Sequence, residues 1–286
     1  MSYFPRCLVL CLVLWHPVVA AEQSTKPDAP AKPETPPPTP GPPTPGPPST
    51  EPPAPPKAAP TIVQLDADRF KIGDFELNKQ TRAIRFPAVI NMREGLLEFV
   101  IVHDKGKVHE SLLRTSVNIT HLNITLKLLR YQSSPELFML RDEDGFPNGL
   151  MPAVDAKTKA AARVDIRMLW KDGETEHSVS VNECINNTRN NKVMPAGPWV
   201  YGGSAVYNGR YVAEMTGDIV AILTNEAAIF NYPGENNRIN ADYGVWYALT
   251  KVIPDVGTPV IVEIRPWSQS AKSESKPTPK PAPKAE

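Results

Sequence analysis

Apolar and polar residues alternate along several short stretches between residues 61 and 268, which predicts a domain built largely from β-strands. The clearest stretch is RVDIRMLWK, residues 163–171, in which every second side chain is apolar and most of the others are charged. The positions predicted to face the interior are Val164, Ile166, Met168 and Trp170. The run GTPVIVEIRP predicts a closing strand, because Pro259 and Pro266 lie where a strand would begin and end.

Turn residues between these stretches predict β-hairpins. Asn208-Gly209 is the strongest signal, because a two-residue turn of this type needs positive φ at both positions. Asp172-Gly173 and the segment 78–81 predict two further hairpins. A loop at residues 104–106, with Gly106 in the left-handed region, predicts a hairpin within LLEFVIVHDKGKVHESLL.

The hairpin at residues 104–106 would pair Ile101 with His109, and it decides which side chains share a face. Glu98 and Glu110 would lie on one face, and His103 and His109 on the other. His109 and Glu110 would then project in opposite directions and would not act on the same ion or proton.

Helical periodicity is strongest in NITHLNITLKLLRY, residues 118–131, where Leu122, Leu126 and Leu129 share a face and Asn118 or Thr120 provides the cap. A second, short helix is predicted after Asn225, and residues 132–160 show no clear period. We therefore expect an α+β fold: mostly antiparallel β-sheet with hairpins, one main helix near 118–131 and one or two short helices.

The two ends of the chain differ from its centre. Residues 1–21 combine one arginine, a short apolar run and small residues, as in a secretory signal peptide. Residues 22–60 hold 17 prolines in 39 positions and predict a disordered linker. Residues 61–268 form the single predicted globular domain, and residues 269–286 a disordered Lys/Pro tail. We expect export to the periplasm or cell envelope, or secretion, with no transmembrane segment in the mature chain.

Charge and cysteine content exclude several functions. Residues 61–268 hold 23 Lys/Arg and 25 Asp/Glu, so this domain carries no basic surface for nucleic acid. Removal of the signal peptide takes away Cys7 and Cys11 and leaves Cys184 alone. One cysteine makes no internal disulfide and no cysteine-ligated iron–sulfur cluster. We expect no cofactor.

Candidate catalytic residues are Glu98, Glu110 and His109. Two carboxylates on one buried face would raise one pKa and would serve acid–base chemistry. The alternative is a structural pair bridged by an arginine such as Arg85, Arg93 or Arg114. His103 and His109 are weak metal candidates, because two ligands are too few without a third from His121 or His177.

Aromatic residues are concentrated in PWVYGGSAVYNGRYVAE. If they are exposed, they form a stacking platform for a glycan or peptide; if they are buried, they belong to the core. The candidate binding residues are Trp199, Tyr201, Ser204, Tyr207 and Tyr211.

The stretches FPAVINMREGLLEFVIVHDKGKVHESLL, PWVYGGS and GTPVIVEI resemble the bacterial YdjY-type domain, from about Phe75 to Arg265. The resemblance implies an exported domain of unknown biochemical role, and no catalytic residues carry over from it. A ferredoxin assignment attached to the family's namesake does not carry over either, because the cysteines are missing.

These patterns favour an exported binding or structural module that contacts an envelope component, with glycan or peptide as candidate ligands. The alternative is an envelope hydrolase or metal-dependent enzyme that uses Glu98, Glu110, His103 and His109. The balance leans away from an enzyme, because no complete catalytic set is visible in the sequence.

Overall fold

The computed structural model describes residues 60–234 and 244–268. The predicted signal peptide (1–21), the proline-rich linker (22–60, apart from Pro60) and the Lys/Pro tail (269–286) lie outside the described residues. These three segments therefore stay predictions.

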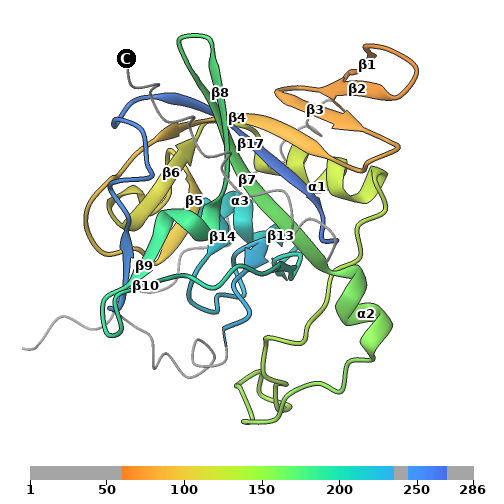
Figure 1. Ribbon diagram of the computed structural model, residues 1–286. Helices are drawn as coiled ribbons and strands as arrows, with labels where there is room; N and C mark the ends of the chain where they lie inside the picture. Colours follow the sequence, from red (N-terminus) through yellow and green to blue (C-terminus); the bar gives the residue numbers. More distant parts are fainter. Residues whose placement is uncertain (1–59, 235–243, 269–286) are drawn as a thin grey trace, which may run out of the picture. The chain divides into compact units, whose positions relative to one another are not determined.

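Eight strands close into a β-barrel (Figure 1). In order around the barrel they are β4 (Ile84–Ile90), β17 (Pro259–Pro266), β7 (Arg163–Asp172), β11 (Trp199–Tyr201), β15 (Phe230–Asn231), β14 (Asp218–Ala221), β5 (Phe99–His103) and β6 (Ser111–Thr115). The barrel closes where β6 pairs with β4, through Val89 with Arg114 and Ile90 with Leu113. The expected open α+β layout is therefore wrong, and the fold is a closed, mostly β structure.

Two pairs of adjacent strands in the barrel, β5 with β6 and β14 with β15, run parallel. The parallel pairing of β5 with β6 shows that the hairpin predicted at residues 104–106 is wrong. β5 runs parallel to β6, with Phe99 opposite Ser111 and Ile101 opposite Leu113. β14 likewise runs parallel to β15. The chain between β5 and β6 crosses over and contains the short 3₁₀ helix η1 (Val108–Glu110) in place of a continuing strand.

Close backbone packing explains why Gly106 belongs to a crossover. Its φ is not positive, so it does not occupy the left-handed turn position that we expected. A Cβ at Gly106 would lie 3.2 Å from the carbonyl oxygens of both His103 and Thr216. A Cβ at Gly217 would lie 2.9 Å from Gly106 Cα. The two glycines let the crossover press against the start of β14, which an antiparallel hairpin would not need.

The remaining strands attach to the barrel or form small sheets. β1 (Ile62–Gln64), β2 (Arg69–Ile72) and β3 (Phe75–Asn78) extend the sheet from β4, and β8 (Thr175–Ser180) pairs with β7. The small sheets consist of β9 (Ile185–Asn187), β10 (Lys192–Val193) and β16 (Trp246–Ala248), and of β12 (Val206–Tyr207) with β13 (Arg210–Tyr211). Asn208 and Gly209 both have positive φ between β12 and β13, as the hairpin prediction requires.

Three α-helices occur within the described residues: α1 (Ile119–Leu128), α2 (Ala156–Ala161) and α3 (Val212–Thr216). The Asn118 side chain caps α1 by accepting a hydrogen bond from the backbone of His121. The helix predicted after Asn225 does not form in this described part of the chain. Instead, the Asn225 side chain accepts a 2.9 Å hydrogen bond from the backbone amide of Ala227 in a turn. These three helices are short, so the fold is mostly β and not the α+β fold that we expected.

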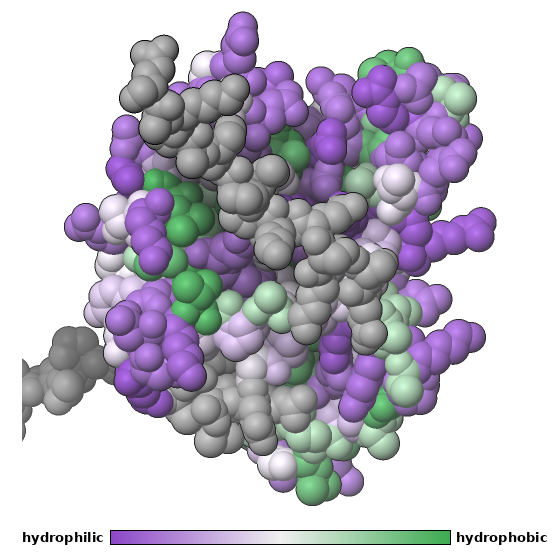
Figure 2. Space-filling view, viewed as in Figure 1, coloured by the Kyte–Doolittle hydropathy of each residue, from purple (hydrophilic) through white to green (hydrophobic). Residues whose placement is uncertain are grey.

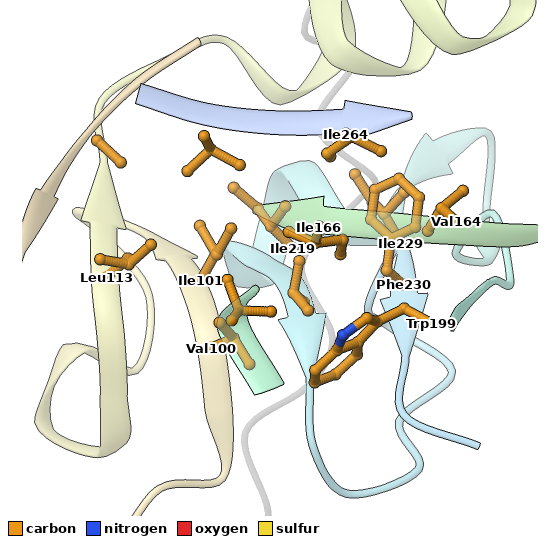
Figure 3. Packing of buried hydrophobic residues seen from close by; sticks show 14 of the residues in the cluster. Val100, Ile101, Leu113, Val164, Ile166, Trp199, Ile219, Ile229, Phe230 and Ile264 are labelled. Carbon is orange, nitrogen blue, oxygen red and sulfur yellow. The ribbon is translucent and has the colours of Figure 1, made fainter. Parts of the chain in front are cut away.

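Large apolar side chains fill the interior of the barrel (Figure 3). Those labelled in the figure are Val100, Ile101, Leu113, Val164, Ile166, Trp199, Ile219, Ile229, Phe230 and Ile264. They come from different strands of the barrel and, for Ile229, from the residue before β15, and they belong to one buried cluster. An eight-stranded barrel is about wide enough for side chains to fill it, and burial of this apolar surface is its main source of stability. Ligands are therefore expected on the outside.

Candidate functional site

The parallel pairing of β5 and β6 brings the two candidate glutamates together. Glu98 precedes Phe99 and Glu110 precedes Ser111, so the two residues lie at the same level of neighbouring strands. The backbone amide of Glu98 donates a 3.0 Å hydrogen bond to the carbonyl oxygen of Glu110. The sequence predicted these residues as neighbours in a hairpin, and they are neighbours across a parallel pair instead.

The same pairing separates the two candidate histidines. His103 ends β5 and pairs with Thr115, whereas His109 lies just before β6 at the opposite end of the strand pair. The four steps from Phe99 to His103 correspond to roughly 13 Å of strand. His103 and His109 therefore do not share a face as expected, and one metal ion would not bind both.

His109 and Glu110 do not project in opposite directions, which corrects a second expectation. They are consecutive residues of η1, and His109 Nε2 lies 3.8 Å from Glu110 Oε2. The His109 side chain is 77% exposed and that of Glu110 is 19% exposed. The 3₁₀ turn breaks the strand alternation from which we expected separation.

Burial raises the pKa of Glu110 above its ordinary value, and the nearby Glu98 carboxylate adds to this shift. His109 and Lys107 act in the opposite direction but do not cancel it, and Asp218 raises the pKa further. Glu110 therefore holds its proton more readily than an exposed glutamate does. Such a group is suited to donating a proton or to pairing with a cation.

No candidate arginine bridges the two glutamates within residues 60–234 and 244–268. Arg85 pairs with Glu263 at 2.6 Å and Arg114 with Asp104 at 2.9 Å. Arg93 pairs with Asp255. The arginine-bridged alternative is therefore wrong, and the nearest compensating groups are Lys107 and His109.

Lys107 joins the crossover to a buried aspartate that the sequence did not identify. Lys107 Nζ lies 3.4 Å from Oδ2 of Asp218, whose side chain is 1% exposed. Asn225 Nδ2 donates a 2.9 Å hydrogen bond to the same oxygen. Asp218 Oδ1 is buried without a hydrogen-bond partner in the described chain. The ammonium also lies 4.6 Å from the ring centroid of Phe99, so Lys107 is held by an ion pair and a cation–π contact.

A shallow groove of about 620 Å³ lies beside His109. Its lining residues are Asn91, Met92, Arg93, Glu94, Val108, His109, Thr250 and Val256. Asn91 Nδ2 donates hydrogen bonds to the carbonyls of Val108 and Ser111, which fixes η1 against the end of β4. The groove is thus formed by three segments that are distant in the sequence.

The other metal candidates are also separated from one another. His121 lies against Gly73, where a Cβ would be 2.7 Å from its Nδ1, and His177 stacks on Trp170 with a centroid distance of 4.7 Å. Across the described ranges, no group of three or more His, Cys, Asp or Glu side chains is placed to hold a metal ion. Cys184 is buried, and burial raises its pKa to about 12, which keeps the thiol protonated.

The aromatic candidates divide between core and surface. Trp199 and Tyr201 are buried in the barrel, and Trp199 Nε1 donates a 2.9 Å hydrogen bond to Asn182 Oδ1. The Ser204 hydroxyl donates to the carbonyl of Ala227 at 2.6 Å. These three residues do not form an exposed stacking platform.

Tyr207 is 67% exposed, and Tyr211 is half-buried with its hydroxyl on the Gly203 carbonyl at 3.2 Å. Val206, beside Tyr207, is also exposed. On the face shown in Figure 2, hydrophobic areas are separated by hydrophilic residues. The exposed part of the predicted platform is therefore reduced to one aromatic ring.

In the part of the chain that the structure describes, no helix has the length and apolar character needed to cross a membrane.

Comparison with known proteins agrees with the resemblance found in the sequence. The YdjY domain model matches residues 75–265, which run from the start of β3 into β17 and include the crossover with Lys107 and Glu110 and the residues of the groove. Searches of the curated proteins and of the solved structures found no match. The family description names no ligand and no reaction. Because the match spans more than half of the chain, the protein belongs to the YdjY domain family.

Proposed function

We propose that this protein is an exported domain of the bacterial cell envelope that binds a ligand or partner on the outside of its barrel and does not act as an enzyme. The signal-peptide pattern of residues 1–21 and the proline-rich segment that follows support export and tethering. The filled barrel interior supports an external site.

The observation that carries the proposal is the groove beside His109. It is a formed concavity, its walls are hydrogen-bonded to each other, and its lining mixes apolar and polar groups as binding sites do. Arg93 Nη2 donates to the Thr250 carbonyl at 3.2 Å, and Thr250 Oγ1 donates back to the Arg93 carbonyl at 2.9 Å. This reciprocal pair fixes one wall without a ligand.

Two measurements test the proposal. Fractionation of a bacterium that expresses the full chain is expected to place the mature protein outside the cytoplasm, shortened by about 20 residues, the usual length of such a signal. Full-length protein retained in the cytoplasm would contradict export. Ligand screening by chemical-shift perturbation is expected to move resonances of Asn91, Val108 and Thr250 together; hits confined to other surfaces would contradict the groove.

A hydrolase is the second candidate function, and one observation favours it. Glu110 has a raised pKa, a carboxylate neighbour in Glu98 and an imidazole 3.8 Å away in His109. Two neighbouring carboxyl groups, one of which holds its proton more readily, are an arrangement that general acid–base catalysis uses.

The variants Glu110→Gln and His109→Ala separate the two functions. If the protein is a hydrolase, a panel of ester, amide and glycoside substrates would reveal an activity that both variants lose while neither variant has a lower unfolding midpoint than the parent. Under the binding proposal, no substrate in the panel is turned over by the parent protein.

A further inference from the structure

We propose that Lys107 and Asn225 join in an isopeptide bond, with Asp218 as the acid–base group of the reaction. The bond links the crossover between β5 and β6 to the segment between β14 and β15. This inference does not depend on the proposed binding function, because it concerns a covalent bond within the chain itself. It is carried by the contacts that hold the three side chains together.

One oxygen of Asp218 contacts both of the reacting nitrogen atoms. Asp218 Oδ2 lies 3.4 Å from Lys107 Nζ and accepts a 2.9 Å hydrogen bond from Asn225 Nδ2. The amine that attacks and the amide nitrogen that leaves are therefore both next to the same oxygen. A carboxyl group in this position can take a proton from the amine and pass one to the leaving nitrogen, as general acid–base catalysis requires.

The carbonyl of the Asn225 amide is held as well. The backbone amide of Ala227 donates a 2.9 Å hydrogen bond to Asn225 Oδ1. A backbone N–H at a carbonyl oxygen stabilises the negative charge that develops there when an amine attacks the carbonyl carbon. The backbone amide of Asn225 in turn donates a 2.7 Å hydrogen bond to Asn231 Oδ1, which fixes the segment. Asn225 thus presents its nitrogen to the acid and its oxygen to a donor.

The surroundings favour a product without charge. The Asp218 side chain is 1% exposed, and its Oδ1 has no hydrogen-bond partner in the described chain. Lys107 Nζ lies 4.6 Å from the centroid of the Phe99 ring. Charges that are removed from water in this way are costly. A reaction that replaces the ammonium with an amide and the carboxylate with a carboxylic acid removes that cost.

The reaction is a transamidation, and its atoms balance. Lys107 passes one proton to Asp218, and the free amine attacks Cγ of Asn225. The Cγ–Nδ2 bond then breaks, and the nitrogen leaves as ammonia with a proton that the Asp218 carboxyl relays from the attacking amine. The site ends with an amide bond and a protonated Asp218, and no oxidant, reductant or further reactant is needed.

We expect the bond to form slowly after folding. Lys107 is half exposed, and its ammonium must lose a proton before it attacks. The fixed positions of the reacting groups compensate in part, because a reaction between groups held in contact has a high effective concentration. Freshly purified protein therefore still holds the ion pair.

The test is the intact mass of the full chain, measured on fresh protein and then daily for a week. Bond formation removes one ammonia, so a species about 17 Da lighter than the sequence mass should accumulate. Trypsin should then release a branched peptide in which residues 106–114 are joined to residues 211–238. Fragmentation of this peptide is expected to place the link between Lys107 and Asn225.

Variants assign the roles of the groups. Lys107→Arg keeps the positive charge but offers no lysine amine, and it should keep its full mass. Asp218→Asn should keep its full mass because the acid–base group is gone. Lys105→Arg is the control, since it replaces an exposed lysine of the same crossover, and it should lose ammonia as the parent does. Should Asp218→Asn fail to fold, Lys107→Arg and the peptide map still decide.

Three results would overturn the proposal. The first is an aged parent protein that keeps its full mass. The second is a lighter species that is as abundant in Lys107→Arg as in the parent. The third is a loss of about 18 Da with a link from Lys107 to Asp218, which would make Asp218 the acyl group in place of Asn225.

Discussion

The backbone amide of Glu98 donates a 3.0 Å hydrogen bond to the carbonyl of Glu110, across two strands that run in parallel. This contact places two carboxylates side by side at one end of β5 and leaves His103 at the other end. The raised pKa of Glu110 follows in part from this arrangement, since the Glu98 carboxylate adds to the effect of burial.

The raised pKa of Glu110 predicts a pH-dependent stability. Its folded pKa lies above the unfolded value, so its contribution to stability is fully present below the unfolded pKa and is lost as the pH rises through the folded pKa. Glu110→Gln mimics the protonated acid. We expect this variant to raise the melting temperature by about 1–4 °C near neutral pH and to leave it unchanged near pH 4.

Glu176→Gln provides the control for this measurement. Glu176 pairs with Lys171, which lowers its pKa, so the pH dependence should have the opposite sign and a small size at this exposed site. A melting temperature that Glu110→Gln lowers near neutral pH would contradict the assignment.

The Lys107–Asp218 pair predicts a coupled effect of two substitutions. Lys107→Met leaves the Asp218 carboxylate buried beside Asn225 without a cation, and we expect a loss of about 2 kcal/mol in unfolding free energy. This is below the value for fully buried pairs, because Lys107 is half exposed. Combined with Asp218→Asn, Lys107→Met should cost less than it does alone. Urea titrations that give additive losses would show that the two residues are not coupled.

Because Gly106 and Gly217 are in close contact, we expect a methyl group added at Gly106 to lower the unfolding free energy. Gly106→Ala would place its Cβ 3.2 Å from two carbonyl oxygens, and we expect a loss of about 1–3 kcal/mol. Gly197→Ala is the matched control, because its φ is not positive and nothing lies within 4 Å of its Cβ position. Equal unfolding midpoints for the two variants would argue against the packed crossover.

Because the Trp199 side chain is fully buried, we expect its fluorescence to be shielded from solvent. Replacing it with Phe removes the hydrogen bond to Asn182 and should cost about 1–3 kcal/mol. The difference between the emission spectra of the parent and the variant gives the emission of Trp199, and we expect it to be blue-shifted and not quenched by acrylamide. Emission that acrylamide quenches would place Trp199 at the surface and revive the stacking platform.

Features set by neighbouring residues could be predicted from the sequence. Asn208-Gly209 forms its turn, and Gly173 lies in the turn that follows Asp172, because the positive φ values at these positions are local requirements. The Asn118 cap of α1 depends on contacts within three residues. In each case the determining contact lies inside the segment itself.

The barrel could not be predicted because its determinants are distant in the sequence. The DKG turn at residues 104–106 has the composition of a hairpin loop, and the contact that overrides it is made with Gly217. Closure depends on Val89 and Ile90 meeting Arg114 and Leu113, which periodicity alone does not reveal.

The candidate site was predicted in part, for a related reason. Glu98 and Glu110 were identified as neighbours because either pairing brings them together. Asp218 and Asn225 were missed, because their contacts with each other and with Lys107 come from two crossovers that only the closed barrel brings together. The roles of the candidate residues stay predictions.

The parallel pairing of β5 with β6 is the central claim, and amide nuclear Overhauser effects on deuterated protein test it most directly. Because Ile101 pairs with Leu113, the structure predicts Overhauser contacts between the backbone amides flanking Ile101 and those flanking Leu113. Contacts that instead join Ile101 to His109 would show an antiparallel hairpin and would contradict the account.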